Sequence, residues 1–174
     1  MLFKPDILKG KTALVTGGAT GIGLQLARGL AKCGATVVIA SRNEKNLAHA
    51  TKDMRAEGGD AHYRLLDIRQ DEMVYAVVSE VIESFGKIDI LVNNAGILVF
   101  SAVQDTSNED FARVFDVNVK SVFYGTKYIL PAMKAAGGGS IVNISSIAAW
   151  EPTVFGKWPK RVARVVAASR RLGR

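Results

Sequence analysis

Short apolar, β-branched segments alternate with longer segments of helical periodicity over the first 150 residues. Apolar residues that recur every three to four positions predict helices, whereas short continuous apolar runs predict strands buried on both faces. The pattern predicts five strands, at residues 11–16, 36–40, 61–66, 88–93 and 140–145. It predicts four helices between them, at residues 21–33, 43–57, 70–85 and 107–136.

Details of the pattern predict how three of these helices begin, end and pack. In the first helix, an apolar face is predicted from Ile22, Leu26, Leu30 and Cys33. The helix at 70–85 gathers its apolar side chains on one face, which comprises Val74, Val77, Val78, Val81 and Ile82. The long helix opens with spacings that suit a capping box, Thr106 with Glu109 and Ser107 with Asp110, and Pro131 is expected to bend or end it.

Strands and helices alternating at this spacing predict right-handed βαβ units. The fold class is therefore α/β, a doubly wound parallel sheet with helices on both faces. We expect residues 1–149 to form this domain and residues 150–174 to form a separate tail.

The turn after the first strand has the composition of a phosphate-binding loop. Residues 16–23 read TGGATGIG and lead directly into a helix. Glycines let the backbone approach a phosphate closely, and the helix start offers unpaired N–H groups and the positive end of its dipole. In the first strand-turn-helix unit of the chain, this pattern predicts a Rossmann-type dinucleotide site. The spacing, G-x-x-x-G-x-G, differs from the G-x-G-x-x-G form.

Arg42, just after the second strand, bears on the choice of cofactor. An acid at this position would bind the adenosine ribose 2′-hydroxyl, whereas a base favours a 2′-phosphate. No acid occurs here before Glu44, and an arginine can bind phosphate through a charge-assisted bidentate contact. The sequence therefore predicts NADP(H) in preference to NAD(H), unless Arg42 is an ordinary surface cation.

Composition narrows the remaining classes. The chain has 174 residues, a net charge of +7 and one cysteine, which excludes an internal disulfide framework and a thiolate zinc site. Two histidines 13 positions apart leave little for a metal site, so none is predicted. No run of 18 apolar residues and no signal-peptide pattern occurs, so we expect a soluble cytoplasmic protein that does not bind membranes.

The positive charge is concentrated in residues 151–174, which carry 7 basic residues and one acid. Residues 1–150 are almost neutral, with 16 basic and 15 acidic residues. A basic tail can bind nucleic acid or anionic lipid, but it is more often simply solvated or poorly folded. We therefore consider nucleic acid an improbable partner.

Five stretches, in order along the first 146 residues, resemble the short-chain dehydrogenase/reductase family. They are TGGATGIG at 16–23, LLDIR around Asp67, NNAG at 93–96, FDVNVKS around Asn118 and IVNISS at 141–146. The opening FKPDILKGKTALVTGG is also similar to 3-oxoacyl- and dienoyl-reducing members. The resemblance implies hydride transfer between a nicotinamide cofactor and a carbonyl or alcohol substrate.

The same resemblance implies a role for each matching residue. The cofactor residues are implied to be Thr16, Gly17, Thr20, Gly21, Ile22 and Gly23 at the pyrophosphate, Asp67 and Ile68 at the adenine, and Asn94, Ala95 and Gly96 along the cofactor. The catalytic residues are implied to be Ser146, which polarises the substrate carbonyl, and Asn118, which orders a proton-relay water. Each has a structural alternative: Asp67 and Asn118 as caps or buried hydrogen bonders, and Ser146 as a strand end. Helix 107–136 resembles the helix through which family members form homo-oligomers.

The family's Tyr-x-x-x-Lys pair has no match. The corresponding residues are Pro159 and Ala163, and no tyrosine follows Tyr128. Tyr124 and Lys127 are interpreted as packing and surface residues. We expect the family's last strands to be missing and the chain to be truncated or frame-shifted after strand five.

Three functions stay open. The first is an NADP-dependent oxidoreductase with impaired turnover, because the general acid contributes roughly 10²–10⁴ in rate. The second is a nucleotide-binding fragment without catalysis. The third, an interaction protein acting through its basic tail, is the least favoured.

Overall fold

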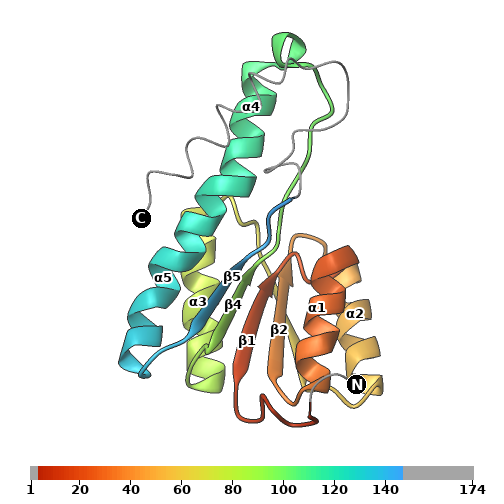
Figure 1. Cartoon of the computed structure of the whole chain (residues 1–174), viewed down its shortest axis with the longest axis vertical. Coiled ribbons are helices and arrows are strands. Elements are labelled where there is room, and N and C mark those ends of the chain that lie inside the picture. Colours follow the sequence, from red (N-terminus) through yellow and green to blue (C-terminus); the bar gives the residue numbers. More distant parts are fainter. Residues whose placement is uncertain (1–3, 147–174) are drawn as a thin grey trace. The chain divides into compact units, whose positions relative to one another are not determined.

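The computed structural model describes residues 4–146 (Figure 1). Five strands form one parallel sheet in the order β3-β2-β1-β4-β5. The strands are β1 (Thr12–Thr16), β2 (Thr36–Ser41), β3 (Ala61–Leu65), β4 (Ile90–Asn93) and β5 (Ser140–Asn143). The helices are α1 (Gly21–Lys32), α2 (Glu44–Ala56), α3 (Asp71–Phe85), η1 (Val103–Asp105), α4 (Asn108–Phe115), η2 (Asp116–Lys120) and α5 (Ser121–Ala135).

The predicted doubly wound parallel sheet is confirmed, and every predicted strand and helix is present with ends that differ by at most two residues. Residues up to Asn143 form one compact unit, and Ile144 begins a second unit, of which residues 144–146 are described. The predicted tail, residues 150–174, lies outside the described residues. Within residues 4–146, no helix combines the length and the apolar composition needed to cross a bilayer.

Strict alternation along the central strands buries both faces of the sheet. In β1, Ala13 and Val15 pack in one cluster with α1 and α2, whereas Leu14 packs in the other with α3 and α5. In β2, Val37 and Val38 divide between the two clusters in the same way. All of these side chains are almost fully buried, which explains why the strands read as continuous apolar runs.

The predicted packing face of α1 is wrong at its first position. Ile22 is 68% exposed, and the buried residues of this helix are Gly23 and Ala27. Small residues at these positions let the helix lie close to the sheet. The size of the side chains therefore determines which face of the helix packs, and apolar periodicity takes no account of size. In α3, by contrast, the predicted valine face is confirmed as buried.

The long predicted helix contains a π-helical turn. Residues 116–120 (η2) separate α4 from α5, and the hydroxyl of Ser121 donates to the carbonyl of Val117 across this turn. Ser107 caps α4 by accepting from the backbone N–H of Asp110 at 3.0 Å, as predicted. Pro131 does not end the helix, which continues to Ala135.

Asp89 links β1 and β4 at the end of the sheet where both strands begin. Its carboxylate accepts from the backbone N–H of Thr12 at 2.9 Å and from the ammonium groups of Lys11 at 2.9 Å and Lys87 at 3.2 Å. Burial works to raise the pKa of Asp89, but these three donors outweigh it and hold the pKa below its ordinary value of 3.8. The ionised carboxylate is therefore part of the folded state.

We expect Asp89→Asn to lower the free energy of unfolding by about 1 kcal/mol at pH 7, because the charge that attracts both lysines is lost. Urea denaturation measures this change. Since the folded pKa lies below the unfolded value, the difference between wild type and variant should persist above pH 3.8 and shrink as the pH falls through the folded pKa. Glu83→Gln, at an exposed position on α3, is the control, and an equal loss there would contradict the assignment.

Candidate functional site

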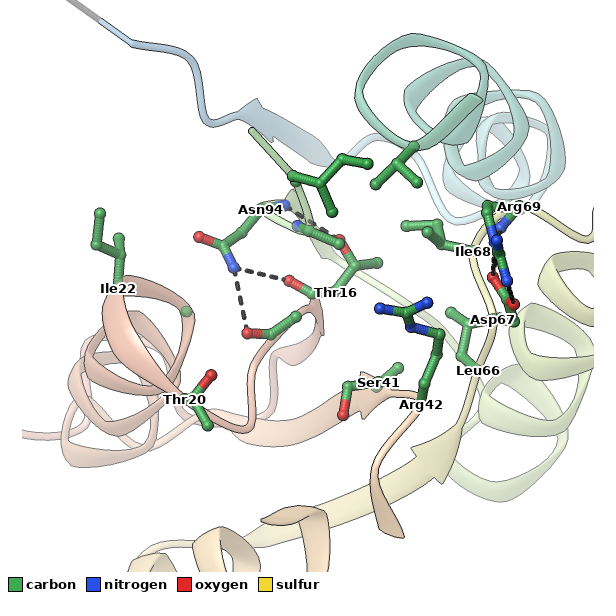
Figure 2. Close-up of a pocket in the computed structure, with 17 residues that line it drawn as sticks. Thr16, Thr20, Ile22, Ser41, Arg42, Leu66, Asp67, Ile68, Arg69 and Asn94 are labelled. Carbon is green, nitrogen blue, oxygen red and sulfur yellow. Dashed lines mark hydrogen bonds and ion pairs between the residues drawn. The ribbon is translucent and has the colours of Figure 1, made fainter. Parts of the chain in front are cut away.

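The main candidate site lies where the strand order reverses, at the carboxyl ends of β1 and β4 (Figure 2). Open α/β sheets bind ligands at such a switch point. A cavity of about 420 Å³ opens here. Its lining comes from the ends of four strands, the start of α1 and the π-helical turn, and comprises Thr16, Gly17, Thr20, Ile22, Gly23, Ala40, Ser41, Arg42, Leu66, Asp67, Ile68, Arg69, Asn94, Ala95, Gly96, Ile97 and Val117.

Thr16 and Asn94 join the ends of β1 and β4. The buried hydroxyl of Thr16 accepts from the backbone N–H groups of Asn94 at 3.1 Å and Ala95 at 3.2 Å, and donates to the carbonyl of Val92. The side-chain amide of Asn94 donates to the carbonyls of Thr16 at 3.0 Å and Gly17 at 3.2 Å (Figure 2). The floor of the pocket is therefore fixed by hydrogen bonds between the two strand ends.

Two glycines allow this close approach. Gly17 has a φ of +65°, and a Cβ there would lie 2.9 Å from the Asn94 amide nitrogen. At Gly23 a Cβ would lie 2.3 Å from the Gly17 carbonyl oxygen and 2.4 Å from the same amide nitrogen. Any side chain at these positions would force the turn away from Asn94.

The start of α1 has the features of an anion site. Thr20 is the N-cap residue, yet its side chain makes no capping hydrogen bond, and no acidic residue occupies the first turn. The N–H groups of that turn are therefore available to a ligand, at the positive end of the helix dipole. Ile22, exposed by the packing of Gly23 against the turn, forms a wall of the pocket.

Charged residues line the other end of the pocket, after β2 and β3. Arg42 extends into the space between Thr16 and Asp67 (Figure 2). Asp67 forms a bidentate ion pair with Arg69, with Nε–Oδ1 and Nη2–Oδ2 distances of 2.9 and 2.5 Å. The hydrogen bonds from Arg69, and to a smaller extent the charge of Arg42, lower the pKa of Asp67 to about 2, although partial burial opposes them. The carboxylate is thus ionised at neutral pH.

Asn118, in the π-helical turn, holds the segment that follows β4. Its side chain accepts from the backbone N–H of Ile97 and donates to the carbonyl of the same residue, both at 2.8 Å. A Cβ at Gly96 would lie 3.4 Å from the Asn118 carbonyl oxygen, which is ordinary van der Waals contact. The same turn places Val117 in the lining. Asn118 itself does not line the pocket, and its amide acts here on the backbone.

The structure brings together eleven of the twelve residues that the sequence predicts for a cofactor. The exception is Gly21, the exposed first residue of α1, which has a φ of +55°. Six lining residues are not among the predicted ones: Ala40, Ser41, Leu66, Arg69, Ile97 and Val117. A sequence signal existed for Arg69, which follows Asp67 by two positions in LLDIR; the positions of Ile97 and Val117 depend on the π-helical turn.

Ser146 is the last described residue; it is exposed and belongs to the second unit. The pocket is therefore described without it. Residues 159 and 163, where the tyrosine–lysine pair would occur, lie outside the described residues. Tyr124 packs against the core, and the ammonium group of Lys127 contacts the Tyr128 hydroxyl at 2.9 Å. Neither Tyr124 nor Lys127 lines the pocket, in agreement with their interpretation as packing and surface residues.

Comparison with known proteins supplies independent evidence. The sequence model of the family described as short chain dehydrogenase matches residues 11–157. Cyclopentanol dehydrogenase of Comamonas sp. (strain NCIMB 9872) is 44% identical over 137 residues, which cover 79% of this chain and 55% of the relative. The chain thus spans about half the length of that relative.

Two solved structures resemble the chain closely. The F189W actinorhodin polyketide ketoreductase with NADPH has a TM-score of 0.82 and 35% identity, over 92% of this chain and 62% of that one. NAD⁺-bound xylitol dehydrogenase has a TM-score of 0.81 and 35% identity, over 90% of this chain and 59% of that one. The two similar structures thus contain different nicotinamide cofactors.

We expect Gly23→Ala to destabilise the protein by roughly 1–3 kcal/mol, because its Cβ would overlap the Gly17 carbonyl and the Asn94 amide. Gly29→Ala, in the same helix, is the matched control, since a Cβ there meets no atom within 4 Å. It should stabilise the helix by about 0.5–1 kcal/mol. Urea denaturation of both variants measures the difference, and equal effects would contradict the close approach at Gly23.

Proposed function

Since the chain belongs to the short-chain dehydrogenase family, we propose that its pocket binds a nicotinamide dinucleotide, NADP(H) in preference to NAD(H). One observation carries the proposal. The turn at residues 17–23 has no room for side chains at Gly17 and Gly23, and it leads into a helix whose first-turn N–H groups lack a side-chain cap. These features suit a diphosphate that lies against the backbone.

The residues of the pocket fit the parts of such a nucleotide. The N–H groups of the turn and of the α1 start would hold the pyrophosphate, with Thr20 beside them. Asp67 and Ile68 would hold the adenine, the carboxylate as acceptor for its amino group and the isoleucine against its ring. Asn94, Ala95 and Gly96 would line the remainder, toward the nicotinamide.

Arg42 supports the preference for NADP(H). Its guanidinium lies in the pocket at the end of β2, where a 2′-phosphate would bind. The relatives do not decide the matter, because one similar structure contains NADPH and another NAD⁺. The preference therefore depends on this chain's own cation.

We propose hydride transfer with a small-molecule carbonyl or alcohol substrate as the reaction. A bound nicotinamide would supply the hydride acceptor or donor, and Ser146 would polarise the substrate carbonyl by donating a hydrogen bond. Asn118 would act by holding Ile97 beside the cofactor segment. Because Pro159 and Ala163 occupy the positions of the family's tyrosine and lysine, we expect the proton transfer to lack its general acid and turnover to be impaired.

The same sequence observation favours a second candidate function, nucleotide binding without catalysis. The phosphate turn, Arg42 and Asp67 do not depend on the tyrosine–lysine pair. A protein with these residues alone would bind the nucleotide and release it unchanged.

We expect Arg42→Ala to weaken NADPH binding about tenfold or more and to change NADH binding by less than about twofold, because only NADPH carries the phosphate. Titration of nucleotide fluorescence measures both affinities. Arg113→Ala, which removes an exposed arginine on α4, is the control and should change neither. Wild-type protein that binds neither nucleotide at millimolar concentration would contradict the proposed function.

The same preparation separates the two candidate functions. We expect NADPH oxidation with a panel of ketones to proceed roughly 10²–10⁴ times more slowly than in a family member with the tyrosine–lysine pair. Nucleotide binding without any turnover would support the second candidate function, nucleotide binding without catalysis. Turnover that is unchanged in Ser146→Ala would contradict the role of Ser146.

We propose that the outer surface of α4, η2 and α5 binds a second copy of the chain. Phe111, Phe115, Val119 and Phe123 follow one another at four-residue intervals and are 44–65% exposed. Side chains at this spacing form a ridge that a second helix can pack against. An apolar surface of this kind is typical of an interface between proteins.

We expect the protein to sediment as a dimer or larger oligomer, and Phe123→Glu to shift it toward the monomer by placing a charge in the apolar ridge. Sedimentation velocity at several concentrations measures the change. Ile7→Glu, at another exposed apolar position (59%), is the control and should leave the distribution as it is. A wild-type monomer at high concentration would contradict the proposed pairing.

A further inference from the structure

Among residues 4–146, the hydrogen bonds to the carboxylate of Asp67 all come from Arg69. Oδ1 accepts from the backbone N–H of Arg69 at 3.1 Å and from its Nε at 2.9 Å. Oδ2 accepts from Nη2 at 2.5 Å and, more weakly, from Nε at 3.2 Å. The Asp67 side chain is only 14% exposed, whereas that of Arg69 is 42% exposed. Both residues line the candidate pocket (Figure 2).

These contacts determine what the carboxylate can still bind. A carboxylate offers about four acceptor positions, and Arg69 occupies two on Oδ1 and one on Oδ2. The Nε group carries one hydrogen, which lies nearer to Oδ1 at 2.9 Å than to Oδ2 at 3.2 Å, so its contact with Oδ2 is the weaker branch of a shared hydrogen bond. The second position on Oδ2 is therefore the one that a ligand donor can use. The bidentate contact also stops the carboxylate from rotating, so the remaining position has a fixed direction.

We propose that Arg69 is a positioning residue that fixes the Asp67 carboxylate so that the pocket selects a purine with an amino donor over one with an oxo group. The inference rests on the proposed function and concerns the base of the nucleotide. An ionised carboxylate only accepts hydrogen bonds, so it can bind the 6-amino group of adenine. Against the 6-oxo group of hypoxanthine, two acceptor oxygens would face each other with no hydrogen between them, which is unfavourable.

Arg69 is better suited to this role than Arg42, the other cation in the pocket. Arg42 influences Asp67 through charge, whereas Arg69 makes all the side-chain hydrogen bonds that the structure shows for the Asp67 carboxylate within residues 4–146. A planar guanidinium presents two parallel N–H groups that match the two carboxylate oxygens, whereas an ammonium group has no such fixed pair of donors. A lysine at position 69 would therefore keep the charge but lose the fixed direction.

The test compares the affinities of NADPH and its hypoxanthine analogue, reduced nicotinamide hypoxanthine dinucleotide phosphate, by calorimetry. Wild type should prefer NADPH about tenfold or more. The preference should fall below about threefold in Arg69→Ala, Arg69→Lys and Asp67→Asn, the last because a side-chain amide can donate as well as accept. Arg64→Ala is the matched control and should keep the full preference. Arg64 lies on β3, outside the pocket, and bonds to Glu80.

A second readout does not depend on the nucleotide. The ¹³C chemical shift of the Asp67 carboxyl, followed against pH, should give a pKa near 2 in wild type and closer to 3.8 in Arg69→Ala. The group should stay ionised to lower pH in wild type because the Arg69 hydrogen bonds favour the charged form. An unchanged pKa in Arg69→Ala would overturn the ion pair itself.

The remaining outcomes are decisive in different ways. An unchanged base preference in Arg69→Ala would overturn the positioning role, and a full preference in Arg69→Lys would show that charge, not the bidentate contact, is responsible. Loss of preference in Arg64→Ala would show a general effect of removing arginine and would also overturn the inference. If wild type binds neither nucleotide, the proposed function fails; if it binds both equally, only the inference about the base fails.

Discussion

The arrangement of the pocket depends on the hydrogen bonds between Thr16 and Asn94. These two residues join the carboxyl ends of β1 and β4, which diverge at the switch point of the sheet. A parallel sheet has no backbone ladder beyond the last paired residues, so side chains must hold the strand ends together there. The small volume of Gly17 and Gly23 is a condition of this contact, because the Asn94 amide lies where their side chains would be.

The two ends of the pocket differ in how they present charge. At the α1 end, the positive potential comes from backbone N–H groups and is therefore fixed by the helix itself. At the β3 end, it comes from two arginines arranged around one carboxylate, so it depends on side-chain pairing. Under the proposed function, the first end would bind the diphosphate and the second would distinguish one nucleotide from another. Binding and discrimination would then depend on different parts of one cavity.

Much of this was predictable from the sequence, because it depends on local patterns. The strands and helices follow from apolar alternation, and most of the pocket follows from the glycine turn and from motifs at strand ends, which a parallel sheet brings to one edge. The packing face of α1 was not predictable from periodicity, since Gly23 and Ala27 pack by being small while Ile22 stays exposed. The π-helical turn has no periodic signature over five residues, so the positions of Val117 and Asn118 could be seen only in the structure.

The π-helical turn at residues 116–120 constrains the number of residues between α4 and α5 more than it constrains their identity. Each residue of a helix turns the following ones by about 100°. Inserting or deleting one residue between α4 and α5 would therefore rotate Val117 away from the cavity or swing Asn118 off the backbone of Ile97, and it would turn α5 relative to α3. Side-chain exchanges on the outer face would leave these contacts intact. We therefore expect related sequences to differ in this segment by substitutions. Insertions and deletions should occur instead in the loop that precedes α4.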